Sequence, residues 1–262
     1  MFNYWKHWMV TGAVFAAAGM GLGDERHFAY NYESGVMAPG GRDIETYSTF
    51  RFGRDQFYSA LDQRLEFEVG LGGNVQTSLY LNFTQEMAGN GNPAVSPVFD
   101  GISNEWRFKL ADNVADPVGI GLYAESEFKP DETELETKVI LDKKEGDFLG
   151  TLNLTFEPEY HWVDNSAALN FIPSLGVGCF LSNQLLVGLE ARLRNFYAGP
   201  SLQETASILS LGPNVNYSGE NWWVTLAVLP QVANFLGGGL DFSNTDVDSQ
   251  RWQIRLATSV HL

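Results

Sequence analysis

Polar and apolar residues alternate along most of the chain, most clearly near its C-terminal end. There, Trp252, Ile254 and Leu256 fall on one face of an extended segment, and Gln253 and Arg255 fall on the other. Because successive side chains of a β-strand point to opposite faces, this period of two predicts a strand with one apolar and one polar face. Roughly eleven earlier segments show the same period. The expected strands are Arg42–Phe52, Phe57–Val69, Val75–Phe83, Ile102–Leu110, Val118–Phe128, Glu134–Asp142, Phe148–Glu157, Leu169–Val177, Leu185–Arg194, Leu209–Tyr217, Trp222–Gln231 and Arg251–Leu262.

The connections between these segments alternate in length. Gly70–Asn74 and Ser218–Asn221 are short and rich in Gly, Asn and Ser, as tight turns are. Thr84–Gly101 and Ala233–Gln250 are long. A meander with short turns at one rim and long loops at the other is the pattern of outer-membrane barrels. Strands of about ten residues, tilted by about 45°, span about 23–25 Å, which matches the apolar band of such barrels.

Alternation alone does not say which face meets water, because a soluble β-protein would place the polar face outward. The aromatic residues distinguish the two folds. Phe52 and Phe128 lie at strand ends near the long loops, and Phe148 and Trp222 lie at strand ends near the short turns, as in interfacial aromatic girdles. In lipid a sheet must also close, to pair its backbone groups. We therefore expect an all-β fold, a transmembrane antiparallel up-and-down β-barrel of about 12 strands, with a soluble β-protein as the alternative.

The first residues predict export. Lys6 precedes an apolar run, Trp8–Met20, and small residues follow before charge begins at Asp24. This order is typical of a secretory signal peptide cleaved near Gly21 or Gly23, with an N-terminal membrane anchor as the alternative. No later apolar run is long enough for a spanning helix, which excludes a helical membrane protein. We divide the chain into a signal peptide (1–23), a periplasmic N-terminal segment (24–41) that either enters the lumen or stays outside it, and the transmembrane barrel (42–262).

The charge balance removes some classes of partner. The formal net charge is −16, whereas a nucleic-acid binder or a protein that docks on anionic lipid needs a basic face. The single cysteine, Cys179, cannot form an internal disulfide. The oligomeric state stays open.

The last expected strand resembles the C-terminal signal of Gram-negative outer-membrane proteins, which is apolar at alternate positions back from the end. Here Leu262, Val260, Leu256, Ile254 and Trp252 carry the pattern, and Thr258 departs from it. The segments Glu33–Gly41, Ile44–Glu45 and Leu79–Phe83 add to the resemblance, which is to a poorly characterised family of about 12-stranded barrels. The resemblance implies outer-membrane lipid as the surroundings and the barrel-assembly machinery as a partner of the C-terminal strand.

Catalytic and metal-binding patterns are weak. His161, with Asp164 and Ser166 nearby, is the one histidine expected at an exposed rim, and a polar rim residue is the simpler interpretation than a catalytic group. Asp241–Asp248 has the alternating oxygens of a cation loop but lacks the acidic residue that would complete one. Gly237–Gly239 is not followed by the lysine of a phosphate loop. We expect no enzyme activity, metal or cofactor.

The polar faces of the expected strands supply the chemistry of the lumen, and their acidic excess favours cations in a water-filled pore. Twelve strands lie between barrels filled by side chains and open porins. We therefore expect a narrow passive channel for small hydrophilic solutes; the alternatives are a non-conducting structural or binding barrel whose loops contact a partner, and an outer-membrane hydrolase. The residues expected to line the lumen and set its selectivity are the acids Glu45, Asp62, Glu66, Glu68, Glu105, Glu125, Glu127, Glu134, Glu136, Glu157 and Glu190 and the bases Arg51, Arg64, Arg107, Lys109, Lys138, Arg192, Arg194 and Arg255.

Overall fold

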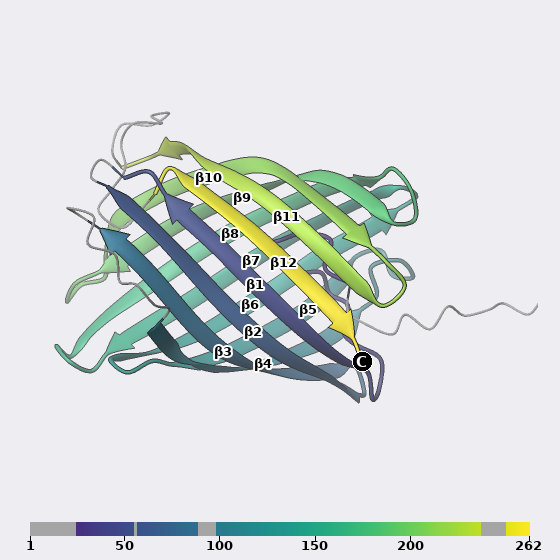
Figure 1. The fold of residues 1–262 in the computed structure, drawn as a ribbon, viewed down its shortest axis with the longest axis horizontal. Helices are drawn as coiled ribbons and strands as arrows, with labels where there is room; N and C mark the ends of the chain where they lie inside the picture. The colour runs from purple at the N-terminus through teal and green to yellow at the C-terminus, as the bar shows by residue number, and fades with distance from the viewer. Residues whose placement is uncertain (1–24, 55–56, 89–97, 237–249) are drawn as a thin grey trace, which may run out of the picture.

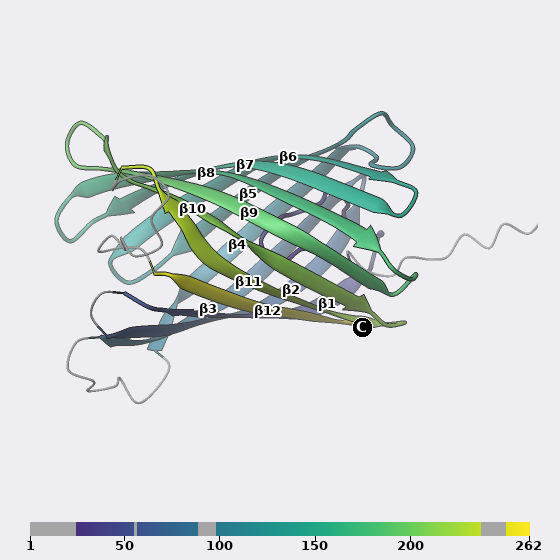
Figure 2. The ribbon, with the colours of Figure 1, turned by 90° about the horizontal axis from the view of Figure 1, so that it is seen from above.

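The computed structural model describes residues 25–54, 57–88, 98–236 and 250–262. These residues form a meander of antiparallel strands that closes on itself as a barrel (Figures 1 and 2). Within them no helix is long and apolar enough to cross a membrane. The strands are β1 (Arg42–Phe52), β2 (Tyr58–Gly72), β3 (Val75–Ala88), β4 (Val98–Ala111), β5 (Gly119–Phe128), β6 (Glu132–Glu145), β7 (Phe148–His161), β8 (Ser166–Phe180), β9 (Leu185–Ala198), β10 (Gln203–Ser218), β11 (Trp222–Asn234) and β12 (Trp252–His261).

The first and last strands form the seam. β1 pairs with β12 from Asp43 opposite His261 to Phe52 opposite Trp252. Each other strand pairs with its neighbours in the sequence. Closure leaves no open sheet edge, as lipid requires.

The two faces of the wall have opposite character. Leucine, valine and phenylalanine side chains are exposed on the outside; Leu79, Leu122, Leu189 and Leu256 are 40–49% exposed. The charged positions between them point inward, and Glu105 on β4 is fully buried. An exposed apolar band around a buried ionic interior is the reverse of a soluble β-protein. The prediction of a transmembrane barrel of about 12 strands is confirmed.

Aromatic residues border the apolar band at both rims. At the rim of the long loops, the rings of Phe52 and Trp252 stack with centroids 6.3 Å apart. At the rim of the short turns, the rings of Tyr217 and Trp222 lie 5.6 Å apart. Phe52 and Trp222 are girdle positions that the sequence predicted.

The strands are longer than the sequence pattern indicated, with up to 16 residues in β10. The alternation of apolar residues marks only the lipid-facing part of a strand, and the ladders of β2 and β3 continue beyond it to Tyr58 opposite Ala88. Ile172 on β8 points inward and is 5% exposed. It is an apolar residue among polar lumen side chains.

The sequence left open whether the N-terminal segment enters the lumen or stays outside it, and in the structure it enters the lumen. Residues 26–37, here called the lumen segment, lie inside the barrel, and Phe28 and Ala29 are fully buried. The expected signal peptide and its cleavage near Gly21 or Gly23 lie outside the described residues, as do Gly237–Gly239 and Asp241–Asp248.

Candidate functional site

The lumen segment crosses the barrel without joining the sheet. It passes β10 and β11 at Arg26, β9 at Tyr30 and β7 at Tyr32, and then β4 at Glu33 and β3 at Met37 before β1 begins. Since residues 26–37 belong to no strand, their backbone groups need partners from the wall when they are removed from water. The inward side chains of the wall supply these partners.

Glu190 on β9 is the strongest single anchor. Its carboxylate accepts the backbone N–H groups of Ala29, Tyr30 and Asn31 at 2.8, 2.9 and 3.0 Å, and the Asn31 side-chain amide at 2.9 Å. Glu190 is fully buried. Four donors around one carboxylate are charge-assisted hydrogen bonds, which compensate for the removal of the charge from water.

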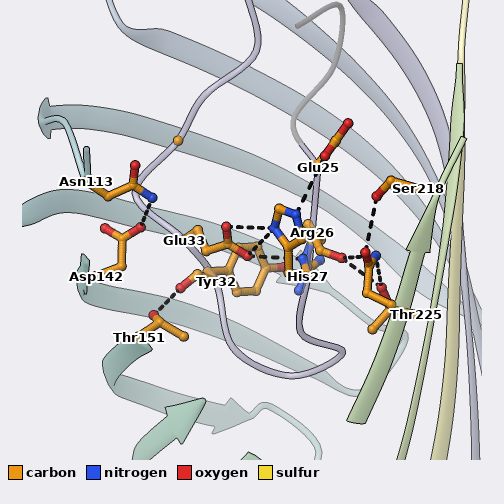
Figure 3. Close-up of polar contacts among 12 residues, drawn as sticks. Glu25, Arg26, His27, Tyr32, Glu33, Asn113, Asp142, Thr151, Ser218 and Thr225 are labelled. Atoms are coloured by element: carbon orange, nitrogen blue, oxygen red, sulfur yellow. Dashed lines mark hydrogen bonds and ion pairs between the residues drawn. The ribbon is translucent and has the colours of Figure 1, made fainter. Parts of the chain in front are cut away.

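Uncharged side chains hold the segment on either side of this anchor. Asn153 on β7 accepts the Tyr32 N–H at 2.7 Å and donates to the Tyr32 carbonyl at 2.9 Å. Asn214 on β10 donates to the His27 carbonyl at 2.8 Å, and Thr225 on β11 donates to the Arg26 carbonyl at 2.7 Å. Figure 3 shows Thr151 of β7 on one side of the segment and Thr225 of β11 on the other.

Arg107 and Gln76 hold the end of the segment that leads to β1. The Arg107 guanidinium donates to the carbonyls of Glu33 and Gly35 at 2.9 and 2.6 Å. Gln76 accepts the Met37 N–H at 2.7 Å. The segment is thereby fixed along its whole length by the wall.

Inward glycines make room for the segment. A Cβ at Gly176 on β8 would lie 3.0 Å from the Phe28 ring. On β5, a Cβ at Gly119 would lie 2.5 Å from Ser34 Oγ, and a Cβ at Gly121 would lie 3.1 Å from Ser34 Cα. Side chains at these positions would occupy the path of the segment, so the wall and the segment are complementary in shape as well as in hydrogen bonding.

An internal ion pair closes the segment on itself near the rim of the short turns. His27 Nδ1 lies 3.0 Å from a Glu33 carboxylate oxygen, and Glu33 also accepts the His27 N–H at 3.0 Å. Burial alone would lower the pKa of His27, but the Glu33 carboxylate outweighs it and raises that pKa above its ordinary value. Burial likewise opposes ionisation of Glu33, but His27 lowers its pKa. The pair is therefore charged over a wider pH range than either group alone.

Buried tyrosines and acids surround Arg26 at the start of the segment. The Arg26 guanidinium lies 3.7 Å from the centre of the Tyr32 ring and donates to the Tyr47 hydroxyl at 2.5 Å. Tyr47 in turn donates to Glu45, and Tyr80 donates to Glu105 in the same way. These contacts fill the lumen on the short-turn side with polar side chains.

A chamber lies between the lumen segment and the rim of the long loops. Its volume is about 340 Å³, and Tyr30 and Tyr32 of the segment form part of its lining. On the wall, Arg51 lies near the loop end of β1, opposite Gln253 of β12, and both line the chamber. The remaining lining residues are Thr49, Asp62, Arg64, Glu134, Glu136, Lys138, Thr155, Glu157, Ile172, Ser174, Arg192, Arg194, Gln250 and Arg255.

The charged residues named from the sequence fall into three groups inside the barrel. In the chamber, Arg51 pairs with Asp62 at 2.6 Å, and Lys138 pairs with Glu136. The chamber members of the predicted set are Arg51, Asp62, Arg64, Glu134, Glu136, Lys138, Glu157, Arg192, Arg194 and Arg255. The others lie outside the chamber lining: Glu45, Glu66, Glu68, Glu105, Arg107, Glu125 and Glu190 are buried inside the wall, and Glu127 and Lys109 are partly buried.

Two of these residues have local roles. Glu127 accepts the Asn82 side-chain amide at 2.8 Å. Lys109 lies at the short-turn end of β4 and pairs with Asp112 at 2.5 Å. The hydrogen bond from Lys109, followed by those from the Ala115 and Val114 N–H groups, holds the pKa of Asp112 well below its usual range. Asp112 thus fixes the turn after β4. Whether any member of the set controls selectivity stays a prediction.

Sequence reasoning missed the residues that hold the lumen segment without charge, namely Asn153, Asn214, Thr225 and Gln76. A search restricted to charged residues on the polar faces passes over them. One signal was available: Asn214 and Asn216 stand two apart on β10, and both donate to backbone carbonyls of the segment, at His27 and Arg26. Amides repeated on the inward face indicate a backbone to be bound there.

The described residues around His161 do not form the arrangement that a serine hydrolase needs. His161 Nδ1 lies 2.8 Å from Glu132, and the Ser166 hydroxyl donates to Asp164 at 2.7 Å. In a catalytic triad the histidine would accept the serine proton. The side chains of Glu132, Glu159 and His161 bring potential ligand atoms within 4.8 Å of one another, so a cation could be held at this rim.

Comparisons with known proteins support the fold. No curated protein matches the sequence. The fold is similar to that of the COG4313 outer membrane channel from Pseudomonas putida F1, with a TM-score of 0.65, 7% identity, and coverage of 87% of this chain and 98% of that one. It is also similar to the NanC porin (TM-score 0.53, 9% identity, 84% and 100% covered) and to the beta domain of the Bordetella autotransporter BrkA (TM-score 0.50, 14% identity, 86% and 100% covered).

At such identities the likeness is one of fold, and one fold serves many functions. The sequence itself matches a family model over residues 21–170 and 156–260, and the chain therefore belongs to the family of unknown function DUF6662.

Proposed function

We propose that the protein is an outer-membrane channel for small hydrophilic solutes in which the lumen segment acts as the gate. The observation that carries the proposal is the division of the lumen. A polar chamber of about 340 Å³ lies on the long-loop side, and the segment that separates it from the other rim belongs to no strand. The segment is held by separate hydrogen bonds to wall side chains and not by the continuous ladder of a sheet. These bonds can therefore break while the barrel stays closed.

The exposed apolar band and the aromatic rims support a position in the outer membrane, surrounded by lipid. The C-terminal strand β12, with Trp252, Leu256 and Val260 exposed on its outer face, is the element that would be presented to the barrel-assembly machinery. The fold shared with an outer membrane channel and a porin supports the same function.

The alternative is a non-conducting barrel that binds a molecule in the chamber. The filled short-turn half of the lumen favours it, because Glu190, Asn153 and most of the segment that they hold are buried. The two functions differ in whether the segment ever leaves its place.

Single-channel recording of the purified, folded full chain in planar bilayers separates them. The channel proposal predicts small, fluctuating currents in the wild type, because the segment is held by reversible contacts. A folded wild type without current, together with a silent Glu190→Gln variant, would favour the non-conducting barrel and overturn the channel.

A further inference from the structure

The chamber differs in charge from the rest of the chain. The protein carries a formal net charge of −16, yet six basic and four acidic side chains line the chamber, which leaves an excess of two positive charges. An excess of one sign of charge around a cavity attracts ions of the other sign. The chamber is thus a basic site within an acidic protein.

The arginines of the chamber differ in their partners. Arg51 pairs with Asp62, and Arg64 pairs with Glu125. By contrast, among the described residues no carboxylate forms an ion pair with Arg192, Arg194 or Arg255. Arg194 donates to the Asn170 amide oxygen at 2.8 Å, and Arg255 donates to the Thr49 hydroxyl at 2.8 Å. Glu157 also lines the chamber and attracts Arg192 and Arg194 from beyond ion-pair distance. The direct contacts of the three arginines therefore leave guanidinium N–H groups available to a ligand.

Tyr30 of the lumen segment joins two of these arginines. The guanidinium carbons of Arg255 and Arg192 lie 4.1 and 4.6 Å from the centre of the Tyr30 ring. The Tyr30 side chain is buried at 6% exposure and lines the chamber, but its hydroxyl has no hydrogen-bond partner among the described residues. Buried hydroxyls are normally paired. A buried, unpaired hydroxyl on a ring that contacts two guanidinium groups, beside a cavity, points to an acceptor with negative charge.

The chamber also offers apolar surface. Ile172 projects inward from β8, is buried, and lines the chamber with the Tyr32 ring. A purely inorganic anion would gain nothing from these groups, whereas the carbon skeleton of an organic anion would contact them. A volume of about 340 Å³ lies at the small end of the range for small-molecule pockets.

We propose that the chamber is a binding site for a small organic anion with carboxylate groups, held by Arg192, Arg255 and the Tyr30 hydroxyl. The guanidinium groups provide charge-assisted, potentially bidentate hydrogen bonds to a carboxylate, and Tyr30 provides a third donor. The inference deepens the proposed function, because it names the class of solute that enters the chamber. It also revises the expectation of cations drawn from the count of lumen acids, since Glu45, Glu66 and Glu105 lie outside the chamber.

Isothermal titration calorimetry of the folded full chain in detergent tests the site with succinate as the probe. We expect saturable binding in the millimolar range or tighter, a dissociation constant raised about tenfold or more in Arg192→Gln and Arg255→Gln, and a smaller rise in Tyr30→Phe. Lys109→Gln makes the same change of charge at the opposite rim and should leave succinate binding unchanged. Equal binding of neutral succinamide would overturn the role of charge, and equal binding of inorganic phosphate would overturn the assignment to an organic anion.

Calorimetry measures succinate binding whether or not the barrel conducts, so the two proposals can fail separately. If succinate binds and the arginine variants weaken that binding while neither the wild type nor Glu190→Gln conducts, the channel fails and the anion site stands. If the wild type conducts but shows no saturable heat with succinate, the anion site fails and the channel stands. If the arginine variants do not fold, heat-modifiable migration on gels shows it, and Tyr30→Phe, which removes a single oxygen atom, then serves as the deciding variant.

Discussion

The carboxylate of Glu190 accepts the backbone N–H of Tyr30 at 2.9 Å, and this contact ties the part of the lumen segment that lines the chamber to the wall of β9. The same carboxylate accepts three further donors from Ala29 and Asn31. No other wall side chain holds so many groups of the segment among the described residues. Whether the segment stays in place should therefore depend strongly on this one residue.

Glu190→Gln should raise the open probability of the channel. Glutamine has nearly the same shape, but it is neutral, and its NH₂ group faces backbone donors in place of an acceptor. Losing one or two charge-assisted hydrogen bonds, each of about 1.5–3 kcal/mol, shifts a docking equilibrium by a factor of about 10 or more. Single-channel recording measures the change. Glu220→Gln, at an exposed position in the turn before β11, makes the same chemical change as a control, and equal currents in both variants would contradict the role of Glu190.

Gly176→Val should displace the segment by occupying its path. The first added carbon would lie 3.0 Å from the Phe28 ring, and the branched side chain would extend farther. Gly150→Val on the neighbouring β7 is the control, because the nearest heavy atom to its added Cβ lies 4.0 Å away. We expect larger currents, and faster proteolysis of the N-terminal segment, in Gly176→Val alone. Unchanged protection from protease would show that the segment adapts to the valine.

The strands could be predicted from the sequence because a lipid-facing wall imposes a strict pattern. Leu256 faces lipid and Arg255 faces the lumen, so apolar and polar residues alternate in the sequence. The lumen segment leaves no such pattern. Asn31 and Tyr32 follow no period, and their places depend on wall residues more than a hundred positions away, Glu190 and Asn153. Whether twelve strands enclose a filled or an open lumen depends on these long-range contacts.

The net charge of the chamber could not be predicted from the sequence either. Counting charges on the polar faces treats all inward positions as one pore. In the structure Glu105 lies with Tyr80 in the filled half of the lumen, whereas Arg192 and Arg255 lie in the chamber. The depth of each side chain along the barrel decides what a solute meets, and alternation carries no information about depth.

The His27–Glu33 pair should make gating depend on pH. The raised pKa of His27 means that its contribution is complete below the ordinary pKa of a histidine, about 6.5, and is lost as pH rises through the raised value. The lowered pKa of Glu33 means that its contribution is complete above about 4.3 and is lost as pH falls through the lowered value. Docking of the segment is therefore strongest between these limits, and open probability should increase on either side.

Other charges near the pair act in both directions. Glu25 lies 3.6 Å from His27 Nε2 and also raises the pKa of His27, whereas Lys144 lowers it; Arg107 lowers the pKa of Glu33. Recording over a range of pH in the wild type and in His27→Gln measures the contribution of the pair. The variant should lose the alkaline rise in open probability, and a rise of the same size in His27→Gln would exclude His27 as its origin.

Leu256→Arg should test which face of the wall meets lipid. Leu256 lies in the middle of β12, is 42% exposed, and pairs with Leu226 and Ser48 of the neighbouring strands. An arginine on the lipid face near the middle of the membrane costs about 2–4 kcal/mol of barrel stability, whereas one near the interface costs about 0–1 kcal/mol. Leu181→Arg, in the short turn after β8 and 63% exposed, is the matched control. The midpoint of urea unfolding in lipid vesicles should fall clearly in Leu256→Arg and little in Leu181→Arg. Equal midpoints would mean that the exposed leucines do not face a membrane interior, and the transmembrane placement of the barrel would have to be abandoned.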